Sequence, residues 1–275
     1  MTTKHLILFL LTMLSHGVFA QISKAWESET VLEVPESVKV YADGNCLFVS
    51  NIAGKPSDKD GVGYISKLSL KGDVIDLKWV EGLDAPKGMA IKEGILYVSN
   101  IDELVLIDIA AAKILKRIER ADADFLNDVS ITHLGDVLVS DSGTSTIFVL
   151  NDDKLDVWLK NESFGRINGL FAEDDYVLLG TASSIVKIDV ASKKHSVFVE
   201  TGGQPDGIEA DGNGGYYYSF WRGELFHFIP GEQPKQLLNS AEDNVQSADI
   251  GYNPDTKEIL VPTFFSNQVV AYTMD

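Results

Sequence analysis

Short apolar runs recur along the chain at an interval of about 40 residues, and each follows a turn. The first run of each unit covers residues 47–51, 96–100, 137–141, 177–181, 216–220 and 259–263. A second run covers residues 64–70, 104–109, 147–150, 185–190, 225–229 and 269–273. A third, more polar run often completes the unit, as at residues 74–80 and 196–200. Short runs separated by turn residues indicate β-strands.

Each unit begins with a related tripeptide, in which a polar residue and a small or polar residue precede an aliphatic one. The copies read ESV, KGM, NDV, NGL, DGI and, least typically, ADI, and they begin at Glu36, Lys87, Asn127, Asn168, Asp206 and Ala248. These positions are 51, 40, 41, 38 and 42 residues apart. Four short strands per repeat of this length are typical of a propeller blade. The sequence therefore predicts an all-β, six-bladed β-propeller.

The two ends of the repeat region predict how the ring closes. Residues 24–32 precede the first blade without belonging to one, and the sixth blade ends after Tyr272 without an outer strand. An N-terminal strand that completes the last blade leaves no free sheet edge, so we expect this closure. The long first interval is explained by an inserted loop at residues 54–63.

The first 20 residues have the features of a secretory signal peptide. Lys4 precedes an apolar centre at residues 6–14, and the segment ends in Val18-Phe19-Ala20. This centre is too short to span a bilayer, and small residues suit a signal peptidase site. A buried first strand is the alternative. We expect a signal peptide at residues 1–20, a single domain at 21–275, export to the periplasm or the medium, and no membrane span after cleavage.

The net charge and the cysteine content limit which classes of binding partner suit this chain. The chain has 23 basic and 41 acidic residues, a net charge of −18. Phosphate recognition depends on clustered Lys and Arg, so nucleic acid and anionic membranes are poor partners. Cys46 is the only cysteine, which excludes an internal disulfide, and we expect a buried, inert thiol. A small-molecule substrate or ligand fits this composition better.

The residues that begin the tripeptides are candidates for a site at the propeller axis. The first strand of a blade lines the central channel, so six such residues can face one point. Glu36, Asn127, Asn168 and Asp206 then supply an oxygen cage, which suits Ca²⁺ or Mg²⁺, although Zn²⁺ can also bind oxygen. Asn and Asp before Gly are also ordinary turn residues, and that is the alternative interpretation.

These motifs resemble the senescence marker protein and gluconolactonase (regucalcin-like) family of six-bladed propellers. The matching segments are VPESV, FLNDV, RINGL and QPDGI, in the family's order and blade spacing. The resemblance implies a divalent cation, Ca²⁺ first and Mg²⁺, Mn²⁺ or Zn²⁺ as alternatives, held by Glu36, Asn127, Asn168 and Asp206. It also implies hydrolysis of a sugar lactone or related ester, with Asp206 accepting a proton and Lys87 stabilising the oxyanion.

The chain departs from the family pattern at two of the expected site positions. Phe125 stands where the family often has a substrate-holding Arg, and Lys87 enters the ring at the second blade, where it could replace the metal. We expect Phe125, Trp221 and Phe264 to contact the substrate. A non-catalytic exported propeller that binds a small molecule, glycan or protein at the channel mouth is the alternative function. Tyr216, Tyr217 and Tyr218 fit either an aromatic binding surface or packing between blades.

Overall fold

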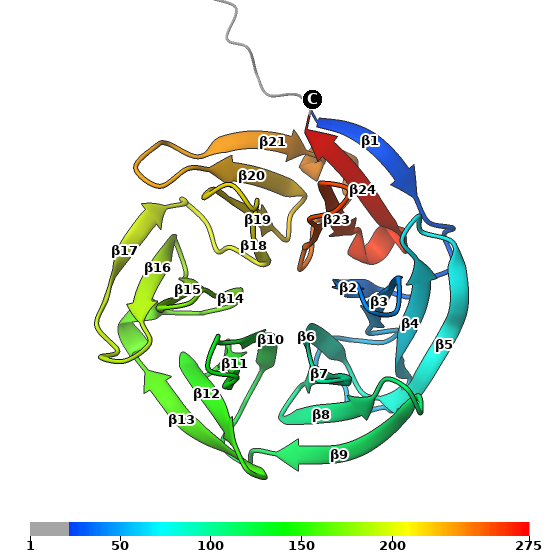
Figure 1. Ribbon diagram of the computed structural model, residues 1–275, viewed down its shortest axis with the longest axis horizontal. Helices are drawn as coiled ribbons and strands as arrows, with labels where there is room; N and C mark the ends of the chain where they lie inside the picture. Colours follow the sequence, from blue (N-terminus) through cyan, green and yellow to red (C-terminus); the bar gives the residue numbers. More distant parts are fainter. Residues whose placement is uncertain (1–21, 275) are drawn as a thin grey trace, which may run out of the picture.

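The structure is a ring of six blades around a central axis (Figure 1). This computed structural model describes residues 22–274, so the predicted signal peptide at residues 1–20 lies outside the described residues. None of the described helices is long and apolar enough to cross a membrane. The all-β, six-bladed propeller predicted from the repeat is confirmed.

Each blade is one four-stranded antiparallel sheet, and the strands are numbered along the chain. Blades one to three contain β2 (Pro35–Tyr41), β3 (Cys46–Asn51), β4 (Gly63–Ser69), β5 (Val74–Leu83), β6 (Pro86–Lys92), β7 (Ile95–Asn100), β8 (Glu103–Asp108), β9 (Lys113–Glu119), β10 (Leu126–Ile131), β11 (Val137–Asp141), β12 (Thr146–Asn151) and β13 (Lys154–Lys160). Blades four to six contain β14 (Leu170–Ala172), β15 (Tyr176–Gly180), β16 (Ser184–Asp189), β17 (His195–Glu200), β18 (Ile208–Ala210), β19 (Tyr216–Phe220), β20 (Glu224–Phe228), β21 (Lys235–Asn239), β22 (Gly251–Asn253), β23 (Glu258–Pro262), β24 (Val269–Met274) and β1 (Ile22–Glu27). Three 3₁₀ turns complete the described elements: η1 (Glu162–Phe164), η2 (Ala241–Asp243) and η3 (Phe264–Ser266).

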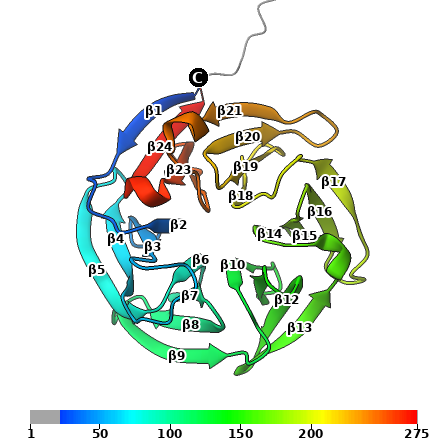
Figure 2. The same ribbon diagram turned by 180° about the vertical axis from the view of Figure 1, so that it is seen from behind.

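The ring closes through the N-terminal strand, as expected from the sequence. Strand β1 pairs antiparallel with β24, from Ile22 opposite Met274 to Glu27 opposite Val270. Both views of the ring show β1 as the outer strand of the sixth blade (Figures 1 and 2). The two ends of the described chain therefore hold one blade together, which leaves no blade with an unfinished sheet.

Packing between neighbouring blades forms the core. The three consecutive tyrosines of β19 show how alternation serves it: Tyr216 and Tyr218 pack with Leu178 and Ile185 of blade four, and Tyr217 packs against blade six. Successive side chains of a strand point to opposite faces, so one strand fills two interfaces. All three tyrosines are at least 95% buried, which confirms the packing interpretation. Cys46 is buried as well.

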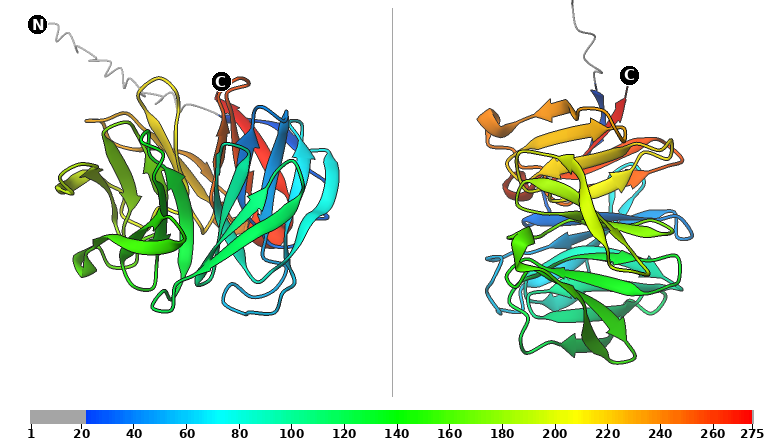
Figure 3. Two further views of the ribbon diagram at one scale, coloured as in Figure 1. Left: turned by 60° about the horizontal axis from the view of Figure 1, so that its bottom comes forward. Right: turned by 90° about the vertical axis from the view of Figure 1, so that its left-hand side faces the viewer.

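Glycines allow the inner strands to come close together at the axis. A Cβ at Gly169 would overlap the backbone oxygen of Asp206, and a Cβ at Gly207 would overlap the backbone nitrogen of Ile250. Both glycines follow a tripeptide's first residue directly. The small second residue of the repeat thus brings the first residues of adjacent blades toward one channel. The right-hand view of Figure 3 shows the ring from its edge, narrower across its thickness than along its diameter.

Candidate functional site at the propeller axis

Irregular strand starts aim the repeat's polar residues at the axis. Glu36, Lys87 and Asn127 are each the second residue of an innermost strand, β2, β6 and β10, and the pairing register of all three strands shifts there. Such bulges re-orient side chains next to active sites. In the shorter strands β14 and β18, Asn168 and Asp206 stand two residues before the strand begins.

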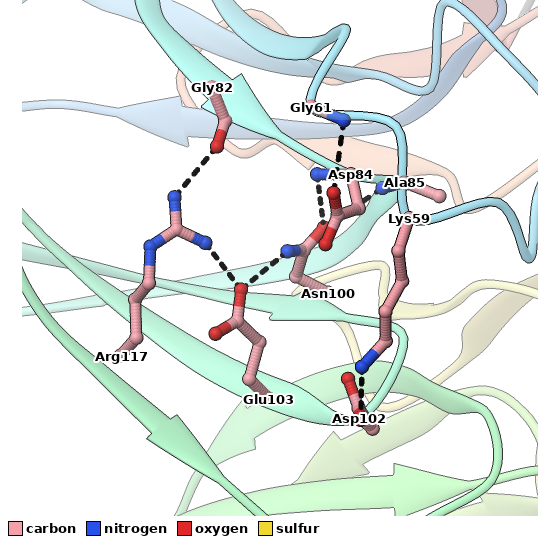
Figure 4. A network of polar contacts seen from close by, with 9 residues as sticks. All are labelled: Lys59, Gly61, Gly82, Asp84, Ala85, Asn100, Asp102, Glu103 and Arg117. Atoms are coloured by element: carbon pink, nitrogen blue, oxygen red, sulfur yellow. Dashed lines mark hydrogen bonds and ion pairs between the residues drawn. The ribbon is translucent and has the colours of Figure 1, made fainter.

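In blades one to three, a polar residue at the end of the second strand fixes the loop that enters the innermost strand. In blade two, Asn100 Oδ1 accepts hydrogen bonds from the backbone N–H groups of Asp84, at 3.0 Å, and Ala85, at 2.9 Å (Figure 4). Asn100 Nδ2 donates to Glu103, which also pairs with Arg117. Asp141 holds blade three similarly, through Asp124 and Phe125, and Asn51 holds blade one. These loops are therefore rigidly placed ahead of Lys87, Asn127 and Glu36.

A cavity of about 550 Å³ opens at this end of the channel. It is lined by Glu36, Ile52, Pro56, Ser57, Lys87, Phe125, Asn127, Arg166, Asn168, Gln204, Asp206, Trp221, Phe264 and Phe265. Every residue that the sequence suggested as a catalytic, substrate-binding or metal-binding group is among them, although the roles of these residues stay predictions. Ala248, the sixth residue of the ring, is fully buried in an apolar cluster instead. The inserted loop contributes Pro56 and Ser57.

The two carboxylates of the cavity are held in unfavourable surroundings. Glu36 is 6% and Asp206 4% exposed, and Glu36 Oε2 has no hydrogen-bond partner among the described residues. Burial, followed by the charge of Asp206, raises the pKa of Glu36 well above its usual value, and Lys87 opposes this. Burial raises the pKa of Asp206 to about 7, against the hydrogen bond from Asn168 and the charge of Arg166. Burial therefore outweighs the opposing charge of Lys87 at Glu36 and of Arg166 at Asp206.

Lys87 lies in the cavity without forming an ion pair. Its Nζ donates to the carbonyl of Ala85 at 2.9 Å and sits 4.3 Å from the ring centre of Phe125. Among the described residues, none of the ion pairs joins Lys87 to Glu36 or Asp206. Burial lowers the pKa of Lys87 to about 8, Glu36 raises it, and Arg166 lowers it further. Lys87 thus leaves the carboxylate oxygens free to bind another cation.

The two amides of the cavity use their nitrogens in hydrogen bonds. Asn127 Nδ2 donates to Ser142 Oγ at 3.1 Å, and Asn168 Nδ2 donates to Asp206 Oδ1. Neither amide oxygen accepts a hydrogen bond from the residues that the structure describes. Carboxylate and amide oxygens suit a hard cation, so the donor set fits Ca²⁺. Three or more His, Cys, Asp or Glu side chains do not cluster at any metal-type site within residues 22–274, so amides must complete the set.

Arg166 is a site residue that the sequence reasoning missed. Its guanidinium carbon lies 5.0 Å from the ring centre of Phe125, and the residue lines the cavity. The signal was its spacing: Arg166 stands two residues before Asn168, the offset that the family's Arg has from the first Asn. In this chain Phe125 stands two residues before the first Asn, Asn127, and the Arg stands two residues before the second Asn, Asn168, one blade later.

Three aromatic residues form the apolar side of the cavity. The ring centres of Trp221, Phe264 and Phe265 lie 4.8 to 6.1 Å apart, in edge-to-face contacts. Trp221 is 41% and Phe265 62% exposed, whereas Phe264 is buried. Phe264 has a φ of 49°, a left-handed conformation that is uncommon for a bulky residue. We refer to these three residues as the aromatic wall.

Comparison with known proteins supports the fold alone. No protein-family model matches the chain, and no curated protein matches it in sequence. A streptogramin B lyase structure is similar, with a TM-score of 0.65, 11% identity, and coverage of 92% of this chain and 97% of the other. The WD40 β-propeller domain of Doa1 also has a TM-score of 0.65 and 11% identity, with 88% and 79% covered. The chain is a six-bladed β-propeller, and its gluconolactonase resemblance stays a prediction.

Proposed function

We propose that the axial cavity binds a divalent cation and hydrolyses a lactone or related ester in an exported protein. The unpartnered, buried Oε2 of Glu36 is the observation that carries this proposal. It lines the same cavity as Asp206, Asn127 and Asn168, which offer one more carboxylate and two unused amide oxygens. Leaving a buried carboxylate oxygen without a partner is costly, so a missing ligand is the simplest explanation.

The charges of the cavity favour an added cation over closure by Lys87. Lys87 and Arg166 act on the carboxylates, yet the pKa of Glu36 still lies well above its usual value and that of Asp206 at about 7. A divalent ion would lower both values and satisfy Glu36 Oε2. Ca²⁺ is our first choice because all four donors are oxygens, and Mg²⁺, Mn²⁺ and Zn²⁺ are the alternatives.

The side chains divide the reaction between them. A cation held by Glu36, Asn127, Asn168 and Asp206 would polarise the ester carbonyl and acidify water. Asp206, a carboxylate that lines the cavity beside the other cation ligands, is suited to orient the attacking water and accept its proton. Lys87 donates one of its three N–H bonds to Ala85, which leaves donors for the oxygen that becomes negative when the carbonyl is attacked.

A non-catalytic binding site is the second candidate function, and the aromatic wall favours it. Exposed Trp221 and Phe265 can stack on a small molecule or sugar whether or not a reaction follows. Both functions use the same cavity, and they differ in their dependence on Asp206. Binding by the wall requires no carboxylate, whereas hydrolysis requires the group that accepts the proton.

The test is hydrolysis of a panel of aldonolactones and aryl esters by the mature chain, with Ca²⁺ or with chelator. We expect Ca²⁺-dependent turnover that falls about 100-fold or more in Asp206→Asn, the order of a general-base contribution. Glu232→Gln, at an exposed position remote from the cavity lining, should keep full activity. Turnover that is unchanged by chelator or by Asp206→Asn contradicts the proposal.

A further inference from the structure

Arg166 is an exposed cation at the mouth of the axial cavity. Its guanidinium makes no hydrogen bond or ion pair with any described residue, whereas Arg117 and Arg120 each pair with a carboxylate. Arg222, which is also exposed, has no such partner among the described residues either, but it does not line the cavity. Arginine has five donors in a planar fork that matches a carboxylate. The unpaired guanidinium of Arg166 therefore indicates that the molecule bound in the cavity carries an anionic group.

A second observation comes from the arrangement around Phe125. The ring holds Lys87 Nζ at 4.3 Å and the Arg166 guanidinium carbon at 5.0 Å from its centre. Lys87 is 1% exposed and Arg166 is exposed, so the two cations stand at different depths. An aromatic face stabilises a cation, and here it fixes two like charges near each other. An anion bound at the mouth would relieve their repulsion.

The rest of the cavity selects among anions. Arg166 is the exposed cation of the lining, and one guanidinium balances the single charge of a carboxylate but not the two charges of a phosphate dianion. The aromatic wall offers Trp221 and Phe265 to an apolar ring. A volume of about 550 Å³ is suited to a ligand of small-molecule size.

We propose that the axial site acts on a small, ring-bearing monocarboxylate whose carboxylate is bound by Arg166 and whose ring packs on the aromatic wall. This inference rests on the proposed function, because it places the ester bond of the substrate further into the cavity than Arg166, between Lys87 and Asp206. The recognised carboxylate is a separate group from the one that hydrolysis creates. Phe125, which replaces the family's Arg, then orients the Arg166 guanidinium by stacking.

Calorimetric titration of three matched probes, phenylacetate, phenylacetamide and phenylphosphonate, tests this inference. In the wild type we expect phenylacetate to bind about 10- to 100-fold more tightly than the amide, the range of a bidentate charged hydrogen bond. Arg166→Gln should remove this preference. Arg222→Gln, another exposed arginine that does not line the axial cavity, should keep it.

The opposing outcomes are distinct. Equal binding of acid and amide, no binding of either, or a preference that survives in Arg166→Gln overturns the inference. Tighter binding of phenylphosphonate overturns the choice of a monocarboxylate. Ca²⁺ titrated into Arg166→Gln separates this idea from the proposed function, because that variant keeps all four cation ligands. A lost carboxylate preference with an intact Ca²⁺ response supports the role of Arg166 alone, whereas a wild type that ignores Ca²⁺ contradicts the proposed function.

Discussion

The axial carboxylates should make the cation-free protein less stable as the pH rises. The pKa of Asp206 is raised from 3.8 to about 7, mainly by burial. A carboxyl whose folded pKa is raised contributes stability that is fully present below pH 4 and is lost as the pH rises through 7. A change from 3.8 to about 7 corresponds to about 4 kcal/mol of lost unfolding free energy at pH 8.

The variant Asp206→Asn isolates this cost, because an amide resembles the protonated acid and can still accept the hydrogen bond from Asn168. With chelator present, we expect the variant to be more stable than the wild type by up to about 4 kcal/mol at pH 8. At pH 4, where the wild-type carboxyl is largely protonated, the difference should be small. Added Ca²⁺ should reverse the order at pH 8, because only the wild type retains the negatively charged carboxylate at the proposed cation site.

Denaturant unfolding at pH 4, 6 and 8 measures this effect. Asp211→Asn is an informative control, because hydrogen bonds from His227, Asn213 and Gly215 lower the pKa of Asp211 despite its partial burial. That carboxylate stabilises the folded state above pH 4, so its removal should destabilise the protein at pH 6 and 8. A destabilisation by Asp206→Asn that is equal at all three pH values refutes the reasoning.

Three further predictions concern the scaffold of the site. Tyr218→Ala should lower the unfolding free energy by about 3–5 kcal/mol in denaturant titrations, because the fully buried ring would leave a cavity, and a loss under 1 kcal/mol contradicts the packing. Asn100→Ala should lower the unfolding free energy by about 2–4 kcal/mol and weaken Ca²⁺ binding, because two N–H groups of the loop lose their acceptor. The control Asn151→Ala, at an exposed position, should change neither quantity. Gly169→Ala should also reduce both stability and Ca²⁺ affinity, because its Cβ would overlap the backbone of Asp206, and unchanged melting and binding would show that the strands can separate freely.

The sequence predicted the ring because its period is visible in the chain itself. Each blade repeats the same spacing of apolar runs, and Glu36, Asn127, Asn168 and Asp206 occupy the same phase, so a single axis places them together. Closure by β1 followed from the missing outer strand of the sixth blade. These features depend on local periodicity and on edge pairing alone.

Contacts between blades were less predictable. Arg166 lies outside the phase of the ring, and only the folded chain brings it over Phe125 of the neighbouring blade. Lys87 was expected to be able to replace the metal, but its Nζ donates a hydrogen bond to the nearby carbonyl of Ala85. The length of β5 was also underestimated, because irregular pairing with β4 continues the strand to Leu83. The contacts that these side chains make depend on distances in the folded chain, although the position of Arg166 two residues before Asn168 was visible in the sequence.

Calorimetric titration of Ca²⁺ into the mature chain at pH 7 tests the axial cation site most directly. We expect one ion per chain, no binding in Glu36→Gln, and unchanged binding in Glu232→Gln. Titrations in two buffers of different ionisation enthalpy should show proton release, because the pKa of Asp206 is about 7 and that of Glu36 is raised as well. Absence of binding by Ca²⁺, Mg²⁺, Mn²⁺ and Zn²⁺, or equal binding by Glu36→Gln, would contradict the proposed site.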